Sequence, residues 1–144
     1  MITISELSEN DFEEVLQIEK VLFINPMNLT QLSNFSKQDS FIIWKIDIGK
    51  TIGYVSFFKI KDEAEIIKIG IEQSYQRKNY GSYVISEMKR IGIKKIFLEV
   101  SVENVKAINF YLKNGFYKTG TRKAYYKQKD NTRVDAFMFS LEFW

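Results

Sequence analysis

The chain has 144 residues, of which 45% are hydrophobic and 27% are charged, and its net charge is +3. This length is enough for one domain with its own core, so we predict a single domain over residues 1–144, and the small charge excess does not indicate nucleic-acid binding. Because cysteine and histidine are both absent, disulfides, thiolate nucleophiles, Ser-His-Asp triads and the usual zinc sites are excluded, and no metal is expected.

The N-terminal half contains strand and helix patterns in short alternation. Residues 2–7, ITISEL, predict a strand, and the Ser-x-x-acid pattern that begins at Ser8 predicts a first helix to about Val21. Apolar residues at helical spacing over 29–35 predict a short second helix. Three runs rich in β-branched and aromatic residues then predict an antiparallel meander: residues 40–46, 51–60 and 64–71.

The C-terminal half continues with two helices and three strands. A helix is predicted from Gly81 to about Ile91, a strand over 94–100, and a helix from Asn104 to Lys113. The second of these helices is expected to turn Val105, Ile108 and Leu112 inward. Residues 116–127 and 134–144 predict strands joined by a hairpin turn over 128–133. The order β-α-α-β-β-β-α-β-α-β-β indicates one α+β domain.

The stretch Gln76–Gly81, QRKNYG, lies between an apolar run and an amphipathic run, which predicts a strand, a tight turn and the start of a helix. Such a turn presents unpaired N–H groups at the positive end of a helix dipole and suits an anion. It lacks the glycines of a dinucleotide fingerprint and the Gly-Lys-Ser/Thr of a Walker loop. From these residues alone, a phosphate site and a polar loop with a solvated Arg77-Lys78 pair both stay open.

Glu99 and Tyr111 are the candidates for acid–base chemistry. Glu99 lies within an apolar strand, on the same face as Phe97, and a partly desolvated carboxylate there suits a general base. The alternative is a glutamate that faces solvent. Tyr111 lies two helical turns after Asn104 and could line the same groove, whereas spacing alone favours an ordinary core tyrosine.

Together these segments resemble the GCN5-related N-acetyltransferase (GNAT) superfamily. The coenzyme A loop of that family reads Arg/Gln-x-x-Gly-x-Gly/Ala and is matched here by Gln76, Asn79 and Gly81. Residues 98–120, LEVSVENVKAINFYLKNGFYKTG, are similar to the strand–Asn–helix–Tyr…Gly-Phe segment of the family. The resemblance implies a mixed, mostly antiparallel central sheet of about seven strands with four helices.

Within the superfamily the chain resembles the bacterial ribosomal-protein-alanine N-acetyltransferases. Residues 18–32, IEKVLFINPMNLTQL, are similar to their early IE…PWS region, with Met27 in place of Trp. Residues 121–139 are similar to their RxNYYP…G…EDAxxM hairpin, with Lys127 in place of the proline and Asp135-Ala136 matching the DA. The ordered set of similarities is more specific than any single motif.

The resemblance implies acetyl-CoA as co-substrate and a role for each matching residue. Strand main chain pairs with the pantetheine arm, a strand amide polarises the thioester carbonyl, loop amides bind the pyrophosphate, and Asn104 hydrogen-bonds the arm. The cofactor-binding residues are Ile69, Gly70, Ile71, Gln76, Arg77, Lys78, Asn79, Tyr80, Gly81, Ser82 and Asn104. Glu99 is the implied general base, acting through water, and Tyr111 is the implied general acid that protonates the departing thiolate.

Asn79 departs from the family pattern, which has a glycine at this position. The loop needs a backbone angle that most residues resist, and Asn is among the few non-glycine residues that enter the left-handed region at modest cost. We therefore expect the loop to keep its shape, while a weaker affinity for acetyl-CoA stays an open question.

The implied function is acetyl-CoA-dependent N-acetylation, with the N-terminal α-amine of a ribosomal protein as the favoured acceptor. An α-amine has a pKa of ~7.7–8.0 and a lysine amine a pKa of ~10.4, so a larger fraction of the α-amine is already neutral at pH 7 and a general base has to deprotonate less of it. The alternatives are a small-molecule amine or lysine acceptor, or a non-catalytic acyl-CoA-binding module.

The N-terminus lacks a signal peptide and no apolar run is long enough for a membrane span, so a cytoplasmic protein is expected. The choice between monomer and homodimer, and acceptor contacts of Tyr125 and Tyr126, stay open.

Overall fold

The computed structural model describes residues 1–23, 26–128 and 130–143, and a seven-stranded mixed sheet runs through it. The element order and the fold class are those predicted from the sequence. The strands are β1 (Thr3–Glu6), β2 (Phe41–Asp47), β3 (Thr51–Ile60), β4 (Glu63–Ile71), β5 (Lys95–Ser101), β6 (Tyr117–Lys127) and β7 (Arg133–Glu142). The helices are α1 (Phe12–Leu22), α2 (Leu29–Ser36), α3 (Tyr80–Arg90) and α4 (Val105–Lys113).

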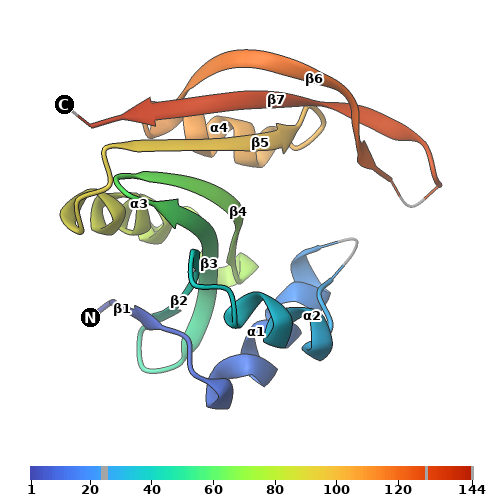
Figure 1. The fold of residues 1–144 in the computed structure, drawn as a ribbon. Helices are drawn as coiled ribbons and strands as arrows, with labels where there is room; N and C mark the ends of the chain where they lie inside the picture. Colours follow the sequence, from blue (N-terminus) through green and yellow to red (C-terminus); the bar gives the residue numbers. More distant parts are fainter. Residues whose placement is uncertain (24–25, 129, 144) are drawn as a thin grey trace.

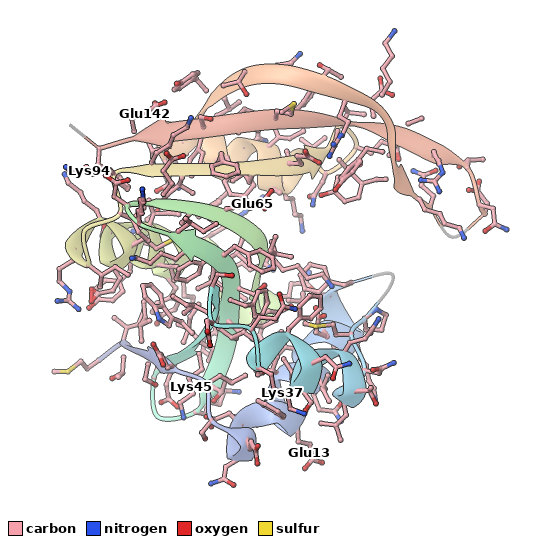
Figure 2. The ribbon with its side chains drawn as sticks, in the orientation of Figure 1. Glu13, Lys37, Lys45, Glu65, Lys94 and Glu142 are labelled. Atoms are coloured by element: carbon pink, nitrogen blue, oxygen red, sulfur yellow. The ribbon has the colours of Figure 1, made fainter. Side chains whose placement is uncertain are left out.

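The strand order across the sheet is β1-β2-β3-β4-β5-β7-β6, and every neighbouring pair is antiparallel except β4 and β5. These two central strands pair only from Glu63↔Lys95 to Glu65↔Phe97. Beyond that point β4 curves away from β5, and the sheet opens between them (Figure 1). Figure 2 labels Glu65 close to the end of the paired stretch, beside β5.

Helices cover both faces of the sheet, so the core has two parts. On one face, α3 and α4 pack on β3, β4, β5 and β7 around buried residues that include Phe57, Met88 and Leu98. On the other face, α1 and α2 pack on β2 and β3 around buried residues that include Val15 and Tyr54. None of the helices in the described ranges combines the length and the apolar run that crossing a bilayer requires.

Helix α4 turns a different stripe inward from the one predicted. Val105 and Leu112 are 61% and 52% exposed, so their predicted burial is wrong. Ile108 packs against the core as expected, but Tyr111 is the buried residue of the helix, with its ring against Phe110 and Phe116. Because an aromatic ring has a large apolar surface to bury, packing of the Tyr111 ring accounts for this rotation of the helix.

Local boundaries follow the sequence with small differences. The pattern at Ser8 leads into a 3₁₀ turn over Glu9–Asp11, in which an Asp11 carboxylate oxygen accepts from the Ser8 amide, and α1 follows directly. The predicted strand over 134–144 ends at Glu142 in the structure. Ile24 and Asn25 in the α1–α2 connection, Lys129 in the predicted hairpin turn, and Trp144 lie outside the described residues.

A buried ionic cluster joins α1 to the two central strands of the N-terminal half. The Glu19 carboxylate is fully buried and accepts hydrogen bonds from the Tyr54 hydroxyl and from Lys68 Nζ, the latter at 3.0 and 3.3 Å. It also accepts from the backbone amide of Met27 at 3.0 Å. Burial, and then the charge of Glu19, raise the pKa of the Tyr54 phenol, so the phenol stays protonated and donates. We call Glu19, Tyr54 and Lys68 the Glu19 cluster.

Glu19→Ala is expected to lower the free energy of unfolding by about 3 kcal/mol, because it removes one partner of a buried ion pair and leaves the Tyr54 hydroxyl without its acceptor. Urea denaturation would measure the change. Gln17→Ala on the exposed side of α1 is the matched control and should stay within about 0.5 kcal/mol of the parent. Equal stability of the two variants would contradict the inferred role of the cluster.

Candidate active site

The opening between β4 and β5 exposes main-chain groups of β4. The Glu72 amide donates to the Ile52 carbonyl at 2.8 Å, so in the antiparallel alternation Gly70 and Lys68 also bond towards β3. The amides and carbonyls of Ile69 and Ile71 therefore point away from β3, towards the opening. No strand pairs with this side of β4 beyond Glu65 in the described residues. The structure thus leaves a strand edge inside the sheet, at the two residues predicted to pair with a cofactor arm.

Gly70 lets α1 approach the back of this strand. A Cβ atom at Gly70 would lie 3.2 Å from Leu22 Cδ1 and 3.3 Å from a ring carbon of Phe23. The neighbouring Lys68 reaches the same side, where its Nζ lies over the Phe23 ring at 4.5 Å and bonds to Glu19. The end of α1 and the Glu19 cluster therefore support the free half of β4 from one face.

The loop at the end of β4 has the shape of an anion cradle. Asn79 adopts the left-handed conformation that the resemblance implied, with φ 68° and ψ 11°, and it is the N-cap residue of α3. Arg77, two residues earlier, is also left-handed, with φ 61°, which the sequence did not predict. The first amides of α3, at Tyr80, Gly81 and Ser82, have no acceptor within the helix. The loop therefore carries exposed Arg77 and Lys78 beside a helix N-terminus.

Two contacts fix this loop. The Gln76 side-chain amide donates to the Ile71 carbonyl at 2.8 Å, which ties the loop back to the end of β4. At the other end, a Cβ atom at Gly81 would lie 2.6 Å from a ring carbon of Phe110, so the first turn of α3 packs closely on α4. Gln76 and Gly81 therefore act in the structure as supports of the loop. Asn104 caps the N-terminus of α4, with its Oδ1 accepting from the Ala107 amide at 3.2 Å.

Glu99 lies on β5, on the far side of the opening from β4. Its neighbours Leu98 and Val100 point into the core with α3 and α4, so the Glu99 side chain points to the opposite face. There the carboxylate is 17% exposed and both of its oxygens contact Arg122 Nη1, at 2.9 and 3.1 Å. The Tyr126 hydroxyl donates to the Glu99 carbonyl at 2.9 Å. Glu99 is therefore a mostly covered, ion-paired carboxylate and does not face open solvent.

Tyr111 lies on the other face of the sheet from the Glu99 side chain. It belongs to the same core cluster as Leu98 and Val100, and its ring also packs on Phe139. Burial, and secondly Tyr126, raise the pKa of its phenol above the ordinary value, so the phenol is protonated at neutral pH. Its hydroxyl makes no hydrogen bond with any described residue. The hydroxyl oxygen is nevertheless not fully buried. The expectation of a core tyrosine is confirmed, and the phenol keeps a proton that it can donate.

A bulge in β6 brings further side chains to Glu99. Arg122 pairs with Ala136 and Tyr126 with Val134, so three residues of β6 lie opposite Asp135 alone. Ala124 in the bulge is left-handed, with φ 52°, and its amide donates to Asp135 Oδ1 at 2.9 Å. The bulge turns Arg122 and Tyr125 to one side, where Arg122 Cζ lies 4.6 Å above the Tyr125 ring.

Sequence reasoning missed Arg122 and the anchoring role of Asp135. The signal that could have found them is the Asp-Ala pair of the hairpin, an acidic residue in an apolar strand.

A groove of about 1030 Å³ lies elsewhere, between α1 and the β2–β3 turn, and includes none of the predicted site residues. Within the described ranges, no group of three or more acidic side chains is arranged to hold a metal ion.

Comparison with known proteins identifies the family. A model of the acetyltransferase (GNAT) family matches residues 3–116, so the chain belongs to that family and is an acetyl-CoA-dependent N-acetyltransferase. It is 27% identical to the [Ribosomal protein bS18]-alanine N-acetyltransferase of Haemophilus influenzae, over 97% of this chain and 98% of that one. The ribosomal-protein-S18-alanine N-acetyltransferase from Escherichia coli has a similar structure, with a TM-score of 0.85, 26% identity, and coverage of 99% and 94%. Arabidopsis thaliana NAA60, solved with acetyl-CoA, shares the fold at a TM-score of 0.83 and 16% identity, covering 99% of each chain.

The left-handed conformation of Asn79 gives a test of the loop. Asn79→Val is expected to weaken acetyl-CoA binding about tenfold, because a β-branched residue there costs about 1–2 kcal/mol or shifts the loop. Asn79→Gly should keep or improve the affinity, since glycine adopts this conformation freely. Calorimetric titration of both variants with acetyl-CoA measures the difference. Equal affinity of the valine and glycine variants would show that the loop shape does not matter for binding.

Proposed function

We propose that the chain acetylates the N-terminal α-amino group of a protein, and that a ribosomal protein with an N-terminal alanine is its acceptor. The support comes from relatives of that activity that align over nearly the whole of both chains. An acceptor of this class would place the reaction in the cytoplasm. The single observation that carries the chemical part is a pair of side chains on opposite faces of the sheet: the ion-paired Glu99 carboxylate of β5 and the buried Tyr111 phenol.

The residues around the opening fit acetyl-CoA. The main-chain groups of Ile69 and Ile71 can pair with the amides of the pantetheine arm as an added strand would, although the Ile71 carbonyl already accepts from Gln76. The amides at the start of α3, with Arg77 and Lys78 beside them, suit the pyrophosphate. When bound, the thioester supplies the activated acetyl group. An amide of Ile69 or Ile71 would then hydrogen-bond its carbonyl oxygen.

Glu99 would act on the acceptor amine, and Tyr111 on the sulfur. At pH 7 roughly a tenth of an α-amine with a pKa of about 8 is already neutral. The remaining molecules are ammonium ions, and each must lose one proton to the base before the nitrogen can react. Glu99, directly or through water, takes that proton. The amine nitrogen then forms its bond to the acetyl carbon, the carbon–sulfur bond breaks, and the Tyr111 phenol gives its proton to the thiolate. Once Glu99 has passed the first proton to solvent, it takes the second proton of the reacting nitrogen and releases that one to solvent too, while Tyr111 regains a proton from water.

A substrate panel tests the acceptor. Peptides that begin with Ala should release free thiol from acetyl-CoA at least tenfold faster, as kcat/KM, than peptides whose single amine is a lysine side chain, because the pKa of the lysine amine is about 2.5 units higher. Spermidine is the small-amine comparison. Faster turnover of spermidine or of lysine peptides would identify a different acceptor class. Tight acetyl-CoA binding without thiol release for any amine would identify a non-catalytic binding module.

Single substitutions test the two catalytic roles. Glu99→Gln and Tyr111→Phe should each lower kcat about 10²-fold while the dissociation constant of acetyl-CoA changes less than about threefold, because each removes a proton-transfer group and leaves the cofactor contacts. Stopped-time thiol assays and calorimetry give the two quantities. Tyr117→Phe removes the same hydroxyl from an exposed tyrosine, so it is the matched control and should keep the parental kcat. Parental turnover of either active-site variant would remove that residue from the mechanism.

A further inference from the structure

The ion pair between Arg122 and Glu99 rests on a single guanidinium nitrogen. One guanidinium nitrogen, Nη1, spans both carboxylate oxygens at 2.9 and 3.1 Å. The two-nitrogen fork that makes Arg–carboxylate pairs strong is therefore absent from this contact. The Arg122 side chain is 54% exposed, whereas Glu99 is 17% exposed. A pair with one solvated partner contributes little, so the carboxylate is covered by a cation that can leave easily.

Arg122 makes a second contact next to Glu99. Its guanidinium carbon lies 4.6 Å over the Tyr125 ring, an arrangement that stabilises the cation without any help from Glu99. Arg122 can thus release Glu99 while it keeps its contact with the Tyr125 ring.

The acceptor needs the position that Arg122 occupies. A protein α-amine is mostly an ammonium ion at neutral pH, and it must come within hydrogen-bond reach of Glu99 to lose its proton. A guanidinium and an ammonium then compete for the same pair of oxygens. If the ammonium replaces the guanidinium, the carboxylate keeps a cationic partner throughout, and the exchange costs little because no buried charge is left uncompensated.

Resting on the proposed function, we propose that Arg122 is a positioning residue that holds the Glu99 carboxylate in the free enzyme and is displaced by the ammonium group of the acceptor. The contact keeps the base aimed across the opening before the acceptor arrives. It also favours acceptors that bring a positive charge, because a neutral group cannot replace the guanidinium. The bulge anchored by Asp135 is what places Arg122 within this reach.

The test compares two forms of one peptide. With an Ala-starting peptide as substrate, Arg122→Gln should lower its KM roughly two- to fivefold, since an exposed ion pair of this strength no longer competes. The inhibition constant of the Nα-acetylated peptide, which has no ammonium, should stay unchanged, and kcat should stay within about twofold. Arg122→Lys should lie closer to the parent than Arg122→Gln, because it keeps a competing cation.

Lys123→Gln is the matched control. It removes the same charge from the neighbouring exposed position, and Lys123 makes no ion pair with Glu99. Its KM should equal the parental value. Three results would overturn the role of Arg122: equal changes for the amine and the acetylated peptide, weaker binding of the amine peptide by Arg122→Gln, or the same decrease in KM for Lys123→Gln. If the parent protein acetylates no peptide, the proposed function itself fails. If the parent is active but the variants behave in one of these three ways, only the exchange at Glu99 fails.

Discussion

The short parallel pairing of β4 and β5 is the constraint on which the site depends. The two strands share a register only from Glu63 to Glu65, and their divergence leaves main chain of β4 without a neighbouring strand. An unpaired strand edge is normally unfavourable inside a protein, because its amides and carbonyls need partners. Here it creates a place where an extended ligand with amides of its own can complete the sheet. The remaining features of the site are arranged around the two sides of that opening.

A strand that lacks one neighbour has to be held by other contacts. On one side β4 pairs with β3 along its length, and behind it α1 packs on Gly70 and sends Glu19 to Lys68. The loop that follows is tied to the same strand by Gln76. These contacts explain why a carboxylate is fully buried in α1, far in sequence from the partners it binds. The Glu19 cluster fixes the free half of β4, while its cost in desolvation is offset by three kinds of donor: a phenol, an ammonium and a backbone amide.

Local patterns were sufficient for the element order and for part of the site. Strand alternation put Glu99 on the face opposite Leu98, and the left-handed preference of Asn anticipated the backbone of Asn79. The sequence could not reveal contacts between distant residues: Glu19 and Lys68 are 49 positions apart, and Glu99 and Arg122 are 23 apart. The predicted inward face of α4 was also wrong at Val105 and Leu112, which are exposed. Its aliphatic residues have the right spacing, but the aromatic ring of Tyr111 fits the core that β5 and β7 provide, which only the packed structure shows.

The sheet itself separates Glu99 from Tyr111, the two side chains proposed to transfer protons. Glu99 lies on a face where cations reach it, and Arg122 already shows that a positive charge is stable there. Tyr111 lies on the apolar face, where burial raises the pKa of the phenol and keeps it neutral. A phenol in that environment is a poor partner for an ammonium, and a carboxylate paired with a cation is a poor proton donor to sulfur. The two faces therefore give the carboxylate and the phenol environments that suit the proposed roles of base and acid.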